Sequence, residues 1–185
     1  MQLRSNLTAD MAELLAIQAE LQRRTLTGGV YKKYFNTATT RTDYPAHWQF
    51  FDAGARYKQR MFRAGNRVGK TTSAGCELVY HLTGIYPDNW TGKRFSGHTQ
   101  WWVCGKSNET VRQILQPLLL GKIGEFGTGL IPADLLDWES LSDAKKAAVG
   151  VGAFRVKHIN GGLSQVEFKS YDQQRQAFEG TERSI

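Results

Sequence analysis

Apolar positions along the chain recur with helical spacing in some segments and with strand spacing in others. The first helix is predicted before Gly28 and Gly29, because apolar side chains return there every three or four residues. These side chains are Met11, Leu14, Leu15, Ile17 and Leu21. We therefore expect residues 1–43 to form an amino-terminal helix and linker, and residues 44–185 to form a separate unit.

From Tyr44 onward the pattern predicts alternating helices and strands. Pro45 at a first turn indicates a helix over 45–57, and a short strand over 60–65 then leads into a glycine turn. The helices and strands expected after this turn are a helix over 70–84, a strand over 99–105, a helix over 107–121 and two strands within 151–172.

Turn residues separate these later segments and help to define the sheet. Ser107 with Thr110, or Asn108 with Glu109, offers a cap for the helix over 107–121. Residues 122–136 are glycine-rich and irregular, and the turn at 160–162 predicts a hairpin. Because strand–helix units follow one another, we expect an α/β fold with a mainly parallel sheet.

Charge and cysteine content narrow the class of protein. The chain has 24 Lys and Arg against 17 Asp and Glu, a formal net charge of +7, which favours a polyanionic partner such as nucleic acid. Cys76 and Cys104 show neither metal-site nor disulfide spacing, so a reducing, cytosolic setting fits. No apolar run is long enough to cross a bilayer and no export signal is visible, which predicts a soluble protein.

Residues 64–71, AGNRVGKT, match the phosphate-loop pattern GxxxxGK[ST] at every fixed position except Ala64. In such a loop backbone N–H groups hold phosphate oxygens, a lysine contacts the β and γ phosphates, and a hydroxyl binds Mg²⁺. Lys70 and Thr71 would take the last two roles; the alternative is an ordinary turn with a solvated lysine. The expected nucleotide contacts in the loop are Ala64, Gly65, Asn66, Arg67, Val68, Gly69, Lys70, Thr71 and Thr72.

Two further residues are candidates for the same site. Arg67 adds a second cation inside the loop, where it could stabilise charge on the transferring phosphate or only balance an acidic neighbour. Gln49 could contact an adenine edge through its amide. Trp48 and Phe51 could stack on that base, but core packing is favoured for both.

With these residues in view, the chain resembles the amino-terminal ATPase domain of tailed-phage terminase large subunits. The likeness runs from about Tyr44 to the last residue and is most specific in NRVGKT (66–71), YPDNWTGKRF (86–95) and SYDQQRQAFEGT (170–181). It implies an additional-strand P-loop ATPase that uses ATP and Mg²⁺ to drive double-stranded DNA into a procapsid. A ring of subunits, the portal protein, the terminase small subunit and a following nuclease domain are also implied, in the host cytoplasm and transiently on the procapsid.

The sequence departs from this family pattern near its end. Relatives follow the FEGT motif with an Asp-Glu pair that holds magnesium and aligns water, and this sequence stops at Ile185 before such a pair. We therefore expect weak Mg-ATP binding and negligible hydrolysis. In many relatives an arginine that acts on the nucleotide of a neighbouring subunit stands at the position of Glu179. Arg175 or Arg183 could take that role here, and the alternative is that both are surface charges.

Other charged residues have weaker assignments. The acidic residues Asp134, Asp137, Glu139 and Asp143 are expected to form a solvated face. The cations considered for DNA phosphates are Lys93, Arg94, Arg155 and Lys157, with solvated faces as the favoured alternative.

Two other functions stay open at this point. The chain could be a non-catalytic fragment recognised by a host defence receptor. It could also be a small P-loop kinase, although no lid arginine cluster or acceptor pocket is identified.

Overall fold

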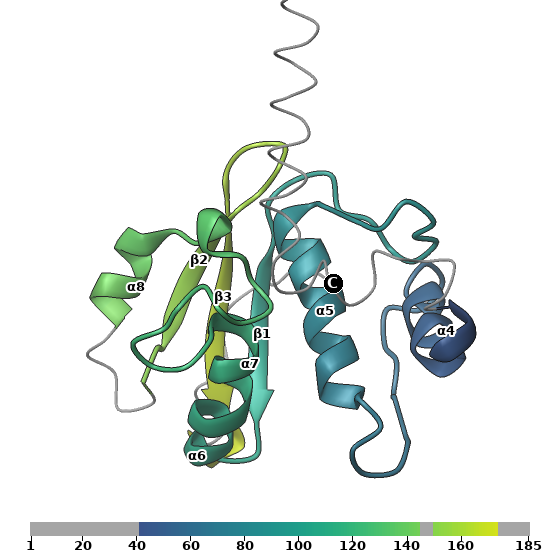
Figure 1. Cartoon of the computed structure of the whole chain (residues 1–185), viewed down its shortest axis with the longest axis horizontal. Helices are drawn as coiled ribbons and strands as arrows, with labels where there is room; N and C mark the ends of the chain where they lie inside the picture. The colour runs from purple at the N-terminus through teal and green to yellow at the C-terminus, as the bar shows by residue number, and fades with distance from the viewer. Residues whose placement is uncertain (1–40, 145–149, 174–185) are drawn as a thin grey trace, which may run out of the picture.

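The computed structural model describes residues 41–144 and 150–173 (Figure 1). The predicted helix before Gly28 and the predictions for Arg175, Glu179 and Arg183 lie outside these residues. Within the described part, no helix is long and apolar enough to cross a membrane.

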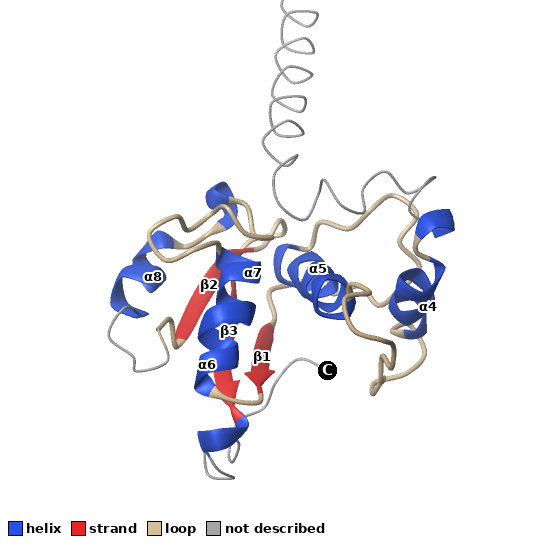
Figure 2. Cartoon of the chain, turned by 60° about the horizontal axis from the view of Figure 1, so that its bottom comes forward, coloured by secondary structure: helices blue, strands red, loops and turns tan. Residues whose placement is uncertain are grey.

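A three-stranded sheet lies at the centre of the described residues (Figure 2). Its strands are β1 (Gln100–Gly105), β2 (Ala153–Lys157) and β3 (Leu163–Ser170), in the spatial order β1-β3-β2. β1 runs parallel to β3, whereas β2 is antiparallel to β3. The α/β prediction is confirmed, but the sheet is mixed rather than mainly parallel, because the hairpin supplies two of its three strands.

One face of the sheet carries the core. In β3 the side chains of Ser164, Val166, Phe168 and Ser170 are buried, and those between them are more exposed. This alternation follows from the two-residue period of a strand. The register pairs Val103 with Phe168 and Phe154 with Val166, so apolar side chains of all three strands share the covered face.

Helices cover this apolar face. The main helix is α5 (Lys70–Thr83), and residues 107–121 form α6 (Asn108–Thr110), a π-helical turn (Val111–Leu115) and α7 (Gln116–Leu120). The predicted Ser107 cap is confirmed, since its side chain accepts from the Thr110 N–H at 3.2 Å. The single predicted helix is interrupted where Pro117, which lacks an N–H, removes an ordinary helical hydrogen bond.

Shorter helical segments complete the described fold. They are a 3₁₀ turn at Ala133–Leu135, α8 (Trp138–Ala144) and a 3₁₀ turn at Tyr171–Gln173. α8 lies beside β2, at the opposite side of the molecule from α4 (Figure 1).

Helix α4 (Pro45–Ala53) packs its aromatic side chains into the core. Trp48 and Phe51 are almost fully buried, and their rings lie 6.1 and 5.1 Å from the ring of Trp90. The core assignment of both residues is confirmed. The helix is shorter than expected because the chain turns at Gly54.

The predicted strand over 60–65 is wrong: these residues have no regular secondary structure and pair with no strand in the described part of the chain. A strand needs a neighbour for its ladder hydrogen bonds, and β1 pairs with β3 instead. Arg60 holds the segment in another way. Its Nη1 donates to the backbone oxygen of Phe50 at 2.6 Å and to the buried carboxylate of Glu77 at 2.9 Å.

Candidate phosphate-binding site

The glycine turn before α5 has an unusual backbone conformation. Gly69, the residue that precedes the helix, has φ 82°, and Arg67 has φ 61°. Both values lie in the left-handed region, which glycine adopts freely and arginine does not. Val68 therefore stands between two left-handed residues, and the turn is bent sharply away from an extended path.

Backbone N–H groups at the start of α5 are free to bind a ligand. The first hydrogen bond of the helix runs from the Ser73 N–H to the Gly69 oxygen, at 2.8 Å. Among the described residues, no group accepts from the N–H groups at positions 69–72. Their positive ends, together with the helix dipole, form a site for an anion.

Lys70 places its charge across the same turn. Its Nζ donates to the backbone oxygen of Ala64 at 2.9 Å and also to that of Gly65. The ammonium group is thereby held against the backbone at the beginning of the turn. Thr71 is exposed and Thr72 is half-buried at the first turn of the helix. The Mg²⁺ contact of Thr71 stays a prediction.

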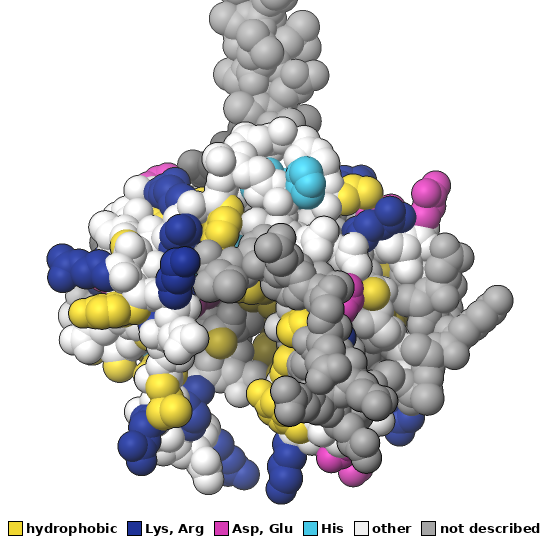
Figure 3. Space-filling view, turned by 180° about the vertical axis from the view of Figure 1, so that it is seen from behind, with side chains coloured by type: hydrophobic (Ala, Val, Ile, Leu, Met, Phe, Trp, Pro, Cys, Tyr) yellow, Lys and Arg dark blue, Asp and Glu magenta, His cyan; other side chains and the backbone are white. Residues whose placement is uncertain are grey.

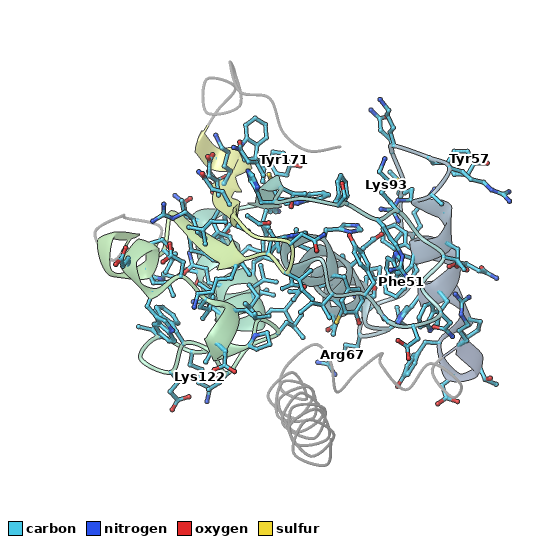
Figure 4. The ribbon with its side chains drawn as sticks, turned by 90° about the horizontal axis from the view of Figure 1, so that it is seen from above. Phe51, Tyr57, Arg67, Lys93, Lys122 and Tyr171 are labelled. Carbon is cyan, nitrogen blue, oxygen red and sulfur yellow. The ribbon has the colours of Figure 1, made fainter. Side chains whose placement is uncertain are left out.

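Arg67 points into solvent from the edge of the molecule, away from Tyr57 and Lys93 (Figure 4). In the described ranges no carboxylate forms an ion pair with it. The structure therefore offers no support for the alternative in which Arg67 only balances an acidic neighbour, and its role in charge stabilisation stays a prediction.

His47 was missed by the sequence analysis and contacts the turn directly. Its Nε2 lies 2.9 Å from the backbone oxygen of Val68, and its ring is stacked on Tyr44 at 5.3 Å. A Cβ atom built on Gly69 would meet His47 Cε1 at 3.0 Å. The only signal in the sequence was the position of this histidine on the helix that already held Gln49.

Gln49 is exposed on α4. Residues two apart on a helix are rotated by about 200°, so Gln49 leaves the helix on a different side from the buried His47. The contact between Gln49 and adenine stays a prediction.

The acidic residues near α8 are not gathered around the turn. Asp137 is half-buried and forms an ion pair with Arg155 at 2.8 Å, so it does not belong to a solvated face as predicted. Asp134 and Glu139 are exposed, and the side chain of Asp143 lies outside the described residues. In the described part of the chain, no group of three or more His, Cys, Asp or Glu side chains could hold a metal ion.

The candidate DNA-contacting cations differ in the groups that lie next to their charges. Arg155 is paired with Asp137, and Arg94 lies over the ring of Tyr86 at 5.0 Å. Lys93 is exposed and lines a hollow of about 320 Å³ together with Arg56 and Lys58. Within the described residues, no carboxylate pairs with Lys93.

Neither cysteine forms a disulfide, as predicted. Burial raises the pKa of the Cys104 thiol, and the nearby charge of Lys169 offsets part of this effect.

Comparison with known proteins gives two matches. Residues 61–185 match the family described as terminase large subunit, T4likevirus-type, N-terminal. The protein named "Terminase, large subunit" of Salmonella phage P22 is 34% identical over an alignment of 158 residues, and the match covers 74% of this chain. The matched region spans 31% of that relative's length. No solved structure matches the chain at a significant level.

Proposed function

Because the chain belongs to the family of terminase large subunits, we propose that it contains the ATP-binding part of a viral DNA-packaging motor. The observation that carries this proposal is that one turn holds both the Lys70 ammonium group and the N–H groups at positions 69–72, which have no acceptor among the described residues. Both features suit the oxygen atoms of a polyphosphate. The fold is accordingly proposed to be of the P-loop NTPase class.

The residues at the turn fit ATP and Mg²⁺. N–H groups donate to phosphate oxygens, Lys70 balances negative charge on the β and γ phosphates, and the Thr71 hydroxyl is a hard oxygen ligand of the kind that Mg²⁺ prefers. The bound ion would neutralise charge that develops on the phosphates. Arg67 extends from the same turn and could stabilise that charge as well.

The whole protein is proposed to couple ATP hydrolysis to the movement of double-stranded DNA into a procapsid. The partners that follow are DNA, the portal protein, the terminase small subunit and further copies of the chain in a ring. These proposals rest on the family, since the matched region spans only part of the relative's length.

The test is nucleotide binding by the 185-residue chain, measured with a fluorescent ATP analogue and Mg²⁺. Lys70→Ala should weaken binding by a factor of about ten or more, because a charge-assisted contact contributes about 1.5–3 kcal/mol. Lys58→Ala is the matched control: this exposed lysine precedes the turn and should leave the Kd unchanged. Equal binding by wild type and Lys70→Ala would contradict the proposed site.

A further inference from the structure

Helix α4 reaches the proposed nucleotide site through one side chain, that of His47. This residue is 6% exposed, and its ring is enclosed by the stacked ring of Tyr44 and the edge contact with Phe62 at 5.6 Å. Packing on both sides limits the rotamers open to the imidazole. The ring is therefore held in place when it meets the turn.

The contact with Val68 fixes which way one peptide group faces. A carbonyl oxygen can only accept, so the Nε2 atom at 2.9 Å carries the proton and donates. The oxygen of Val68 and the N–H of Gly69 belong to the same planar, trans peptide and point in opposite directions. Holding this oxygen toward α4 turns the Gly69 N–H away from α4.

That N–H is one of the four that no described group accepts from. The Val68–Gly69 peptide precedes the hydrogen bonds of α5, whose first bond is to the Gly69 oxygen, and among the described residues His47 is the group that holds its oxygen. Without His47, this peptide would lose the contact that fixes its orientation. A donor that is already aimed needs no reorganisation when the ligand arrives.

We propose that His47 is a positioning residue for the phosphate-binding turn, which holds the Val68–Gly69 peptide so that the Gly69 N–H faces bound phosphate. This inference rests on the proposed nucleotide site. It adds a function for α4 that does not depend on contact with the base.

The experiment compares variants of the full 185-residue chain, using ATP with Mg²⁺ for affinity and inorganic tripolyphosphate as a probe for the amide signals. His47→Ala should weaken ATP binding about ten-fold, the equivalent of one hydrogen bond of about 1.4 kcal/mol. His47→Gln keeps an N–H donor and should stay within about three-fold of wild type. Tripolyphosphate should shift the Gly69 amide resonance in wild type and His47→Gln and shift it less in His47→Ala.

The variant Phe51→Leu distinguishes the positioning role of His47 from a general effect of helix packing. It loosens the packing of the same helix without touching the turn. This variant should lower the melting temperature and leave the ATP Kd unchanged. ATP binding by His47→Ala within two-fold of wild type would overturn the inference, as would equal weakening in His47→Gln. Failure of the proposed nucleotide site is distinguishable, because Lys70→Ala would then bind ATP as well as wild type.

Discussion

At the residue scale, two glycines of the turn have different structural requirements. Gly69 has φ 82° and lies against His47, whereas a Cβ on Gly65 would meet nothing within 4 Å. Ala64 is exposed and has no left-handed backbone, which explains how alanine is tolerated at the first position of the pattern. The glycine that matters for the shape of the turn is therefore the last one.

Gly69→Ala should lower the free energy of unfolding by about 1–2 kcal/mol, the cost of a left-handed non-glycine residue. It should also weaken ATP binding, since the new methyl group displaces His47. Gly97→Ala is the control and should change neither quantity, because Gly97 lies outside the turn and a Cβ there would meet nothing within 4 Å. Chemical denaturation and ATP titration measure both, and equal effects of the two substitutions would contradict this assignment.

At the element scale, the hairpin of β2 and β3 meets the end of α5 through His158. The ring is buried against Gly84, where an added Cβ would lie 2.6 Å from His158 Cε1. Its Nδ1 accepts from the Asn160 N–H at 3.2 Å, so the neutral ring carries its proton on Nε2. Burial, with a smaller effect from His98, lowers the pKa of His158 below the usual 6.5.

This lowered pKa predicts a pH-dependent stability. Between the lowered value and 6.5 the unfolded chain binds more protons than the folded one, so the contribution of His158 is complete above pH 6.5 and falls as the solution is acidified. The unfolding free energy of His158→Gln should therefore change less between pH 7.5 and pH 5.5 than that of wild type. His98→Gln is the control, and it should keep most of the wild-type dependence. An unchanged pH profile in His158→Gln would contradict the assignment.

At the scale of the whole molecule, the net charge of +7 favours association with DNA. Lys and Arg side chains lie at several places on the rear face, with fewer acidic ones (Figure 3). Contacts to phosphates would be independent of base sequence.

Double-stranded DNA should bind with an affinity that falls as salt rises, with a log–log slope of about −0.9 for each phosphate contact. Lys93→Gln should reduce the steepness of this slope by about one contact. Arg155→Gln should not, because Asp137 already neutralises Arg155. Fluorescence anisotropy at several salt concentrations measures the slopes, and a larger effect of Arg155→Gln would show that the contact surface lies elsewhere.

Local patterns predicted most elements but not how they assemble. The apolar spacing located α4, α5 and the hairpin, because each buries one face in the core. It failed for residues 60–65, where a strand-like sequence has no partner strand among the described residues. It also could not show the ion pair of Asp137 with Arg155, since that contact depends on how the connection before α8 pairs with the distant strand β2.

The same limit applies to the candidate site. The phosphate-loop pattern identified Gly69 and Lys70 from consecutive residues. His47 lies 21 positions before Val68, and only the folded chain brings its ring to that carbonyl. A single sequence indicates no more than the position of His47 on the helix that also holds Gln49.

Arg60 has a mechanical consequence when it is considered with His47. Arg60 joins α4 to α5 through Phe50 and Glu77, and His47 joins α4 to the turn. One attachment point allows a helix to pivot, but two attachment points restrict that rotation. The two contacts therefore hold α4, the turn and α5 at fixed positions relative to one another. Loss of either contact should allow the helix to swing about the one that is left.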